Sequence, residues 1–197
     1  MLDEHMGRRY VLRDYPGAAE ACALAERREW SVVGERPADP ERGLPFEMVW
    51  LIEPGCKFYF THEETARCGH VHVGGRFAEP VERHTEDLGR QPEVHSGAEL
   101  LQIVDGASTP EERGAALLKL GVGAPHRFDR DFFDRTRAGL EDPDVRLRDL
   151  ALWAATYSPW AEYKRIIEKL ARSDPDRGVR RRAKVTLDAL RRVVPDQ

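Results

Sequence analysis

The chain has 197 residues, of which 41% are hydrophobic and 34% charged, and its formal net charge at pH 7 is -4. This composition predicts a globular protein of one domain or two small ones, and it excludes a general attraction to nucleic acid or anionic lipid. No run approaches the roughly 18 to 20 apolar residues of a membrane helix, and the N-terminus lacks the apolar core of a signal peptide. We therefore expect a cytoplasmic protein whose 3 cysteines are reduced thiols or ligands. Arginine outnumbers lysine, which together with the alanine content suggests a GC-rich bacterial genome.

The first part of the chain, residues 1–90, has the period of β-strands. Four runs, WSVVGER, FEMVWLIE, KFYFTHE and CGHVHVGG, alternate or cluster β-branched and aromatic residues between Gly and Pro. Pro54 and Gly55 predict a tight turn between the second and third runs. Helical spacing near 17–29 and 80–88 predicts a helix on each side of the strands. The predicted class of this part is α+β, a small antiparallel sheet with flanking helices.

The last strand carries three potential metal ligands, Cys68, His70 and His72. Residues two apart on a strand point to the same face, so these side chains form a row while the valines between them face the core. Zinc could use this row, completed by Cys56 or His62 of the neighbouring strand. The alternative is a half-exposed sheet face with polar side chains. The sequence favours that alternative, because three positions along a line do not surround a metal as a tetrahedron does.

The segment 89–97 is polar and broken by proline, and it is the predicted linker. From there to the end, residues 98–197, the hydrophobic period is 3.6, which predicts helices. Three phrases repeat in this second part, TPEERGAALLKLG from Thr109, DPDVRLRDLALWA from Asp142 and DPDRGVRRRAKVTL from Asp174. Each begins with Thr or Asp and a proline, and continues with an acidic residue, an arginine and an apolar helical run.

The three phrases are evenly spaced, and helix capping explains which residues begin each of them. Their arginines, 33 and 34 residues apart, are Arg113, Arg146 and Arg180. Periods of this length are typical of stacked helical arrays. The Thr or Asp that begins each phrase is a predicted N-cap, and the proline after it is the predicted first helical residue. Each unit should therefore have a helix with a sharp start.

The units LEDPDVRLRDLALWAA and LARSDPDRGVRRRAKVTLDAL resemble HEAT repeats, whose second helix commonly begins with a D-P-x-V-R phrase. The resemblance covers about Thr109 to Val194. The first unit departs from the pattern, since it begins with Thr and has Glu112 where the others have valine. The third unit contains Arg177 and Gly178 as an apparent insertion. The resemblance implies a HEAT-like helical array after the α+β module, and such arrays mostly bind proteins on a long curved surface.

We therefore expect a non-catalytic scaffold or accessory subunit that binds, stabilises or regulates a partner enzyme in a hetero-oligomer. No cofactor is expected, because neither GxxxxGK[ST] nor GxGxxG follows a predicted strand. Aromatic residues with nearby arginines are enriched at binding hot spots. The predicted partner-binding residues are Trp153, Tyr157, Trp160, Arg146 and Arg148.

Two other functions remain open at this point. Some HEAT-like proteins are DNA glycosylases, and the last helix is locally basic, so a nucleic-acid-binding or repair protein is the second hypothesis. Its contact residues would be Arg180, Arg181, Arg182 and Lys184. The short array, the many acidic residues and the negative net charge count against this hypothesis. The third is a zinc-dependent activity in the first module.

Overall fold

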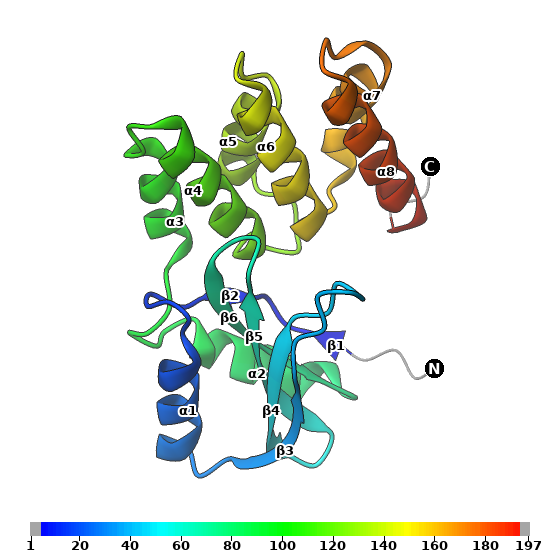
Figure 1. Cartoon of the computed structure of the whole chain (residues 1–197). Coiled ribbons are helices and arrows are strands. Elements are labelled where there is room, and N and C mark those ends of the chain that lie inside the picture. The colour runs from blue at the N-terminus through cyan, green and yellow to red at the C-terminus, as the bar shows by residue number, and fades with distance from the viewer. Residues whose placement is uncertain (1–4, 194–197) are drawn as a thin grey trace. The chain divides into compact units, whose positions relative to one another are not determined.

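The computed structural model describes residues 5–193, and the chain divides into two compact units between Ser96 and Gly97 (Figure 1). The fold is mixed, with an antiparallel sheet in the first unit and helices alone in the described part of the second. Within residues 5–193, none of the helices combines the length and the apolar character needed to cross a bilayer.

The first unit is a six-stranded antiparallel sheet with two helices. The strand order is β1-β6-β5-β4-β3, and β2 also pairs with β6. The four longer strands and both helices agree with the prediction from the sequence. In chain order the elements are β1 (His5–Met6), β2 (Tyr10–Val11), α1 (Ala18–Arg27), β3 (Ser31–Arg36), β4 (Phe46–Glu53), β5 (Cys56–Glu63), β6 (Cys68–Gly75) and α2 (Ala78–Leu88).

The core of this unit lies on one face of the sheet, beneath α1 and α2. The alternation along β6 places Val71 and Val73 on that face, as predicted, next to Phe58 and Phe60 of β5. The helices contribute the buried residues Ala21, Leu24, Ala25, Val81 and Leu88. This packing fixes the register of the strands, because a slip by one residue would turn the apolar set to the other face.

The turn between β4 and β5 has the predicted chemistry. Gly55 has a φ of 84°, a left-handed conformation that glycine adopts without steric cost, and Pro54 precedes it. Glu53 and Cys56 pair across this turn, and the register shifts between Leu51 and Glu53. The side chains of Glu53 and Cys56 are therefore positioned by a tight, irregular hairpin.

The predicted linker, 89–97, contains the division between the two units, and part of it packs against the first unit. Val94 is buried in the core of the first unit and forms a bridge with Leu12. The backbone N–H of His95 donates to the carbonyl of Val11 at 2.8 Å. Single residues of a polar stretch make these contacts, so a periodic hydrophobic pattern could not predict them.

The second unit arranges its helices in two layers. Helices α4, α6 and α8 pack in sequence on one side, and α3, α5 and α7 pack behind them, so that α3–α4, α5–α6 and α7–α8 form neighbouring pairs (Figure 1). The helices are α3 (Gly97–Asp105), α4 (Pro110–Val122), α5 (Arg130–Leu140), α6 (Val145–Tyr157), α7 (Lys164–Ser173) and α8 (Arg177–Val193), with a 3-10 turn at Ala161–Tyr163.

The start of α4 is the one that the sequence predicts. Thr109 is the N-cap, and its side chain accepts from the backbone N–H of Glu112 at 3.2 Å. The Glu112 carboxylate accepts in return from the backbone N–H of Thr109 at 3.0 Å, which completes a capping box. Pro110 is the first helical residue.

The starts of α6 and α8 differ from the prediction by two residues. The N-cap of α6 is Asp144, whose carboxylate accepts from Arg146 N–H at 2.8 Å, and Asp176 accepts from Val179 N–H at 2.9 Å. The predicted caps, Asp142 and Asp174, instead accept from the backbone two residues ahead, at 2.8 and 2.9 Å. The D-P-D phrase therefore forms an Asx-type turn followed by a cap, and its proline precedes the helix.

Equivalent arginines in the second and third repeats are Arg148 and Arg180, which are 32 residues apart. Nη1 of each donates to the carbonyls five and six residues earlier, at 2.9 and 2.9 Å for Arg148 and at 2.9 and 2.6 Å for Arg180. In this register Arg146 aligns with Gly178, and the apparent insertion in the third repeat disappears. The predicted equivalence of Arg146 and Arg180 is wrong.

Candidate functional site

A groove of about 450 Å³ lies between the N-terminal halves of α6 and α8. It is apolar at Leu150 and at the buried Val179, and the half-exposed Val145 stands at its edge. The remaining lining residues are charged or small, and they are Arg146, Asp149, Asp176, Gly178, Arg181 and Arg182.

Two arginines at the groove are held in place by their neighbours. The Arg182 guanidinium pairs with Asp149 and lies over the ring of Trp153, 4.8 Å from its centroid. Arg146 pairs with Asp144 at 2.7 Å and with Glu111 of α4 at 2.8 Å. The hydrogen bonds that Arg146 donates to the Asp144 carboxylate, and the charges of Asp144 and Glu111, raise the pKa of Arg146 above its ordinary value. Both cations are therefore preorganised.

Arg181 presents its charge differently. It is exposed, and it forms no ion pair with any residue from 5 to 193. Because a partner does not have to displace an existing ion pair at this position, its charge is available at the rim of the groove.

The predicted partner-binding aromatics have different environments. Trp153 is half-buried beside the groove, and Tyr157 is half-buried at the end of α6. Trp160 is only 5% exposed, and its Nε1–H donates to the carbonyl of His126 at 3.2 Å. Trp160 also stacks on Tyr163, with ring centroids 5.7 Å apart, and burial raises the pKa of Tyr163 to about 12. The structure contradicts a surface role for Trp160.

Arg148 is also unavailable for partner binding, contrary to the prediction. Its side chain is 9% exposed and that of Asp174 is 2% exposed. Nε and Nη2 of Arg148 donate to the two carboxylate oxygens of Asp174 at 2.7 and 2.9 Å. Arg148 therefore joins α6 to the loop before α8, and its function is structural.

The basic helix α8 offers fewer charges than its sequence suggests. Arg180 is bonded to backbone carbonyls and Arg182 to Asp149. Arg181 and Lys184 are exposed and have no ion-pair partner among residues 5–193. Of the four predicted nucleic-acid contacts, two therefore have internal partners.

The row of Cys68, His70 and His72 on β6 is buried, not half-exposed as expected. His70 is 5% exposed and His72 is 7% exposed. His72 stacks on the ring of Tyr59, with centroids 4.7 Å apart. Burial holds the pKa of His70 well below its ordinary 6.5, and the charges of Arg9 and His72 lower it further.

The residues expected to complete a zinc site with this row lie on the opposite face. Cys56 pairs with Gly75, and His62 pairs with Gly69. Residues paired across antiparallel strands point the same way, so Cys56 and His62 share the face of the core valines. The predicted combination of the row with Cys56 or His62 is wrong.

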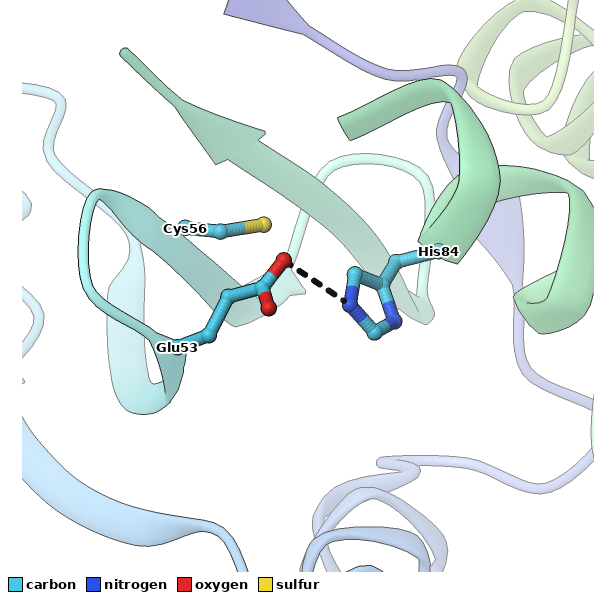
Figure 2. A group of neighbouring side chains, drawn as sticks. All are labelled: Glu53, Cys56 and His84. Carbon is cyan, nitrogen blue, oxygen red and sulfur yellow. Dashed lines mark ion pairs between the residues drawn. The ribbon is translucent and has the colours of Figure 1, made fainter. Parts of the chain in front are cut away.

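A different group of ligand-type side chains does converge in the first unit. Glu53 at the end of β4, Cys56 at the start of β5 and His84 on α2 each place one ligand atom within 4.8 Å of the others (Figure 2). Among residues 5–193, no other group of three or more His, Cys, Asp or Glu side chains places its ligand atoms this close together. The E-x-x-C spacing across the turn is a local signal, whereas the approach of His84 depends on how α2 packs.

The electrostatics of this group centre on Glu53. Its Oε1 lies 3.5 Å from Nε2 of His84 (Figure 2). The same oxygen accepts from Nη2 of Arg83 at 2.7 Å. Cys56 is 1% exposed. Burial raises the pKa of the Cys56 thiol, and the Glu53 carboxylate raises it further, while Arg83 opposes both. The thiol is therefore protonated at neutral pH and is not an activated nucleophile.

The chain was compared with known protein families, with characterised proteins and with solved structures, and none of them matches. The HEAT resemblance and every predicted function therefore remain predictions.

Proposed function

We propose that the protein is a non-catalytic accessory subunit or scaffold that binds a partner protein through the α6–α8 groove. The groove takes an acidic segment of that partner. The observation that supports this proposal is an open groove with an apolar floor and an exposed arginine, Arg181, at its rim.

The charges of the groove favour an acidic ligand. Its lining contains three arginines and two aspartates. Asp149 pairs with Arg182, and the Asp176 carboxylate accepts from the backbone of α8. Arg181 is the arginine of this lining that has no ion-pair partner among residues 5–193. Complementary potentials increase the rate of association and select the partner.

The fixed side chains beside the groove suit a binding surface. Arg182 is held between Asp149 and Trp153, so little side-chain entropy would be lost when a partner contacts it. Aromatic and arginine residues in such settings dominate binding energies. Of the residues predicted from sequence, Arg146 and Trp153 are therefore retained as partner contacts, with Tyr157 at the end of the same helix.

Nucleic acid is a less suitable ligand. A phosphate-binding surface needs several free cations along a track, and each contact adds to the salt dependence of binding. On α8 two of the four predicted cations are engaged with other groups of the protein. A protein partner needs only a short basic rim next to an apolar floor, which the groove provides.

The test uses a matched pair of charge reversals in the full-length protein. Arg181→Glu changes the groove, and Arg165→Glu places the same change on α7, where Arg165 is exposed and has no ion-pair partner among residues 5–193. Tagged wild type and both variants are purified from the source organism. Co-purifying proteins are identified, and their binding segments are mapped by cross-linking from position 145.

The expected result is a partner whose cross-linked segment is acidic, bound by wild type and by Arg165→Glu but at least about tenfold less by Arg181→Glu. Equal binding by Arg181→Glu, or a cross-linked segment without acidic residues, would refute the proposal. Nuclease-sensitive capture of RNA or DNA, reduced in Arg181→Glu, would support the nucleic-acid hypothesis instead.

A further inference from the structure

The group formed by Glu53, Cys56 and His84 is a second candidate site, distinct from the groove. We propose that these residues bind one divalent transition-metal ion of the zinc class, with the thiolate sulfur of Cys56, a ring nitrogen of His84 and a carboxylate oxygen of Glu53 as ligands.

The ligand types fit this class of ion. Zinc combines thiolate, imidazole and carboxylate ligands, whereas magnesium and calcium prefer oxygen ligands alone. A thiolate and a carboxylate together neutralise the charge of a divalent ion in the largely buried space around Cys56. The mixed set therefore selects against the hard cations that are more abundant in cells.

The geometry is close to a binding geometry. Zinc bonds of about 2.0 to 2.3 Å at tetrahedral angles place ligand atoms roughly 3.5 Å apart. The three atoms lie within 4.8 Å of one another, and Glu53 Oε1 is already 3.5 Å from His84 Nε2. Small side-chain rotations would close the remaining distance.

The backbone supports the same conclusion. Glu53 and Cys56 flank the Pro54-Gly55 turn, as two ligands spaced x₂ apart flank a turn in many zinc sites. His84 approaches from α2, which packs on the core face of the sheet where Cys56 lies, so a hairpin and a helix both supply ligands (Figure 2). A turn and a packed helix hold ligands more rigidly than a mobile loop would.

Arg83 explains how the site is stable without a metal. Its Nη2 lies 2.7 Å from the Glu53 carboxylate, and its Nη1 lies 3.1 Å from the Glu79 carboxylate. When a metal ion takes the Glu53 oxygen, Arg83 retains Glu79 as a partner. Arg83 is therefore a competitor of the metal, and its removal should strengthen metal binding.

Binding follows a simple proton balance. The Cys56 S–H bond breaks, the sulfur forms a bond to the metal, and the proton leaves to solvent. No electron is transferred. Three protein ligands leave one tetrahedral position, which water or another small ligand would fill.

The test uses the full-length protein after removal of metals with a chelator. Cobalt(II) is titrated and the near-ultraviolet charge-transfer band of a thiolate–cobalt bond is recorded. Zinc binding is measured in parallel by calorimetry. We expect one ion per chain and a thiolate band. Cys56→Ser should abolish the band, whereas Cys68→Ser, which alters another buried thiol, should retain it.

Variants of the other residues separate metal binding from folding. His84→Gln and Glu53→Gln should each weaken zinc binding by at least about tenfold, since even outer groups contribute roughly 10- to 100-fold. Arg83→Gln should instead bind zinc more tightly than wild type. A purely structural cluster would not give this increase, because Arg83→Gln only removes an ion pair.

Three results would overturn the proposal. They are the absence of a thiolate band at saturating cobalt, a band that persists in Cys56→Ser, and zinc affinity that falls or stays constant in Arg83→Gln. If Cys56→Ser does not fold, the opposite signs expected for Arg83→Gln and Glu53→Gln still decide the question. Neither outcome depends on partner binding at the α6–α8 groove.

Discussion

Arg146 and Arg148 are two residues apart on α6 and have opposite environments. Arg146 is 62% exposed and pairs with carboxylates on the surface, whereas Arg148 is buried and bonded to both oxygens of Asp174. A surface pair contributes little to stability, but removing one partner of a buried pair leaves a charge without compensation. The two arginines should therefore respond very differently to mutation.

We predict that Arg148→Met lowers the free energy of unfolding of the second unit by about 3 to 5 kcal/mol. Burial alone would raise the pKa of Asp174, but the hydrogen bonds from Arg148 bring it below the ordinary value, and the variant loses them. Urea denaturation measures the change. Arg146→Met should have a much smaller effect. Adding Asp174→Asn to Arg148→Met should recover part of the loss, and a failure to do so would contradict the buried-charge explanation.

His70 gives a prediction about pH. Its pKa in the folded protein is well below 6.5, first because of burial and then because of Arg9 and His72. In the unfolded chain the imidazole takes up a proton near pH 6.5, so below that pH the unfolded state binds more protons and folding becomes less favourable. The contribution of neutral His70 to the free energy of unfolding is therefore fully present above pH 6.5. It should be lost as the pH falls from 6.5 toward the pKa of His70 in the folded protein.

Two measurements check this prediction. Nuclear magnetic resonance titration of the His70 ring should show no protonation at pH 6.5. Urea denaturation at pH 8 and pH 5 should show a larger decrease for wild type than for His70→Phe, which has no proton to bind. Equal decreases in both proteins would assign the pH dependence to other groups.

At the level of elements, period and turn chemistry predicted much of the first unit. The runs in β3 to β6 extend over six to eight residues each and alternate, so their pattern is readable. Strands β1 and β2 have two residues each, too few to show any period, and only their pairing with β6 defines them. The starts of α6 and α8 were missed by two residues, since D-P-D offers two possible caps and the choice depends on the turn before the helix.

Helices α4 and α6 approach closely at Gly121. A Cβ atom at this position would lie 2.5 Å from the carbonyl oxygen and 2.8 Å from Cα of Ala154. Both are backbone atoms, so the helices themselves would have to move apart. Glycine is required here by the packing of two helices.

Gly121→Ala should therefore destabilise the protein, although alanine in a helix is ordinarily favoured over glycine by about 1 kcal/mol. The expected loss is about 1 to 3 kcal/mol, as for other overpacked cores. Thermal unfolding of the variant and of wild type shows whether the substitution lowers or raises stability. Gly34→Ala is the control, because the nearest atom to its Cβ would be Val49 Cβ at 3.7 Å. A stabilised Gly121→Ala would show that the α4–α6 contact is looser than described.

The two sites differ in how far the sequence could predict them. Arg146 lines the groove and Trp153 lies beside it, and both belong to a repeat phrase that is visible in the sequence. Glu53 and Cys56 are visible as a pair across a turn, but His84 joins them only because α2 packs near the β4–β5 hairpin. A site whose ligands come from separate elements depends on tertiary packing, which local patterns do not contain.

For the whole molecule, the division at Ser96 and Gly97 leads to the last prediction. Each side contains its own buried core, formed by sheet and helices in the first unit and by paired helices in the second. The fragments 1–96 and 97–197 should therefore each fold when expressed alone. Circular dichroism should show a helical spectrum and a cooperative transition for 97–197, and the thiolate–cobalt band should remain with 1–96.

A fragment without a cooperative transition would mean that its core requires the other half. A cobalt band that appears only in the full chain would mean that the Glu53, Cys56 and His84 ligands require residues beyond 96, in contrast to the local geometry of the β4–β5 turn and α2.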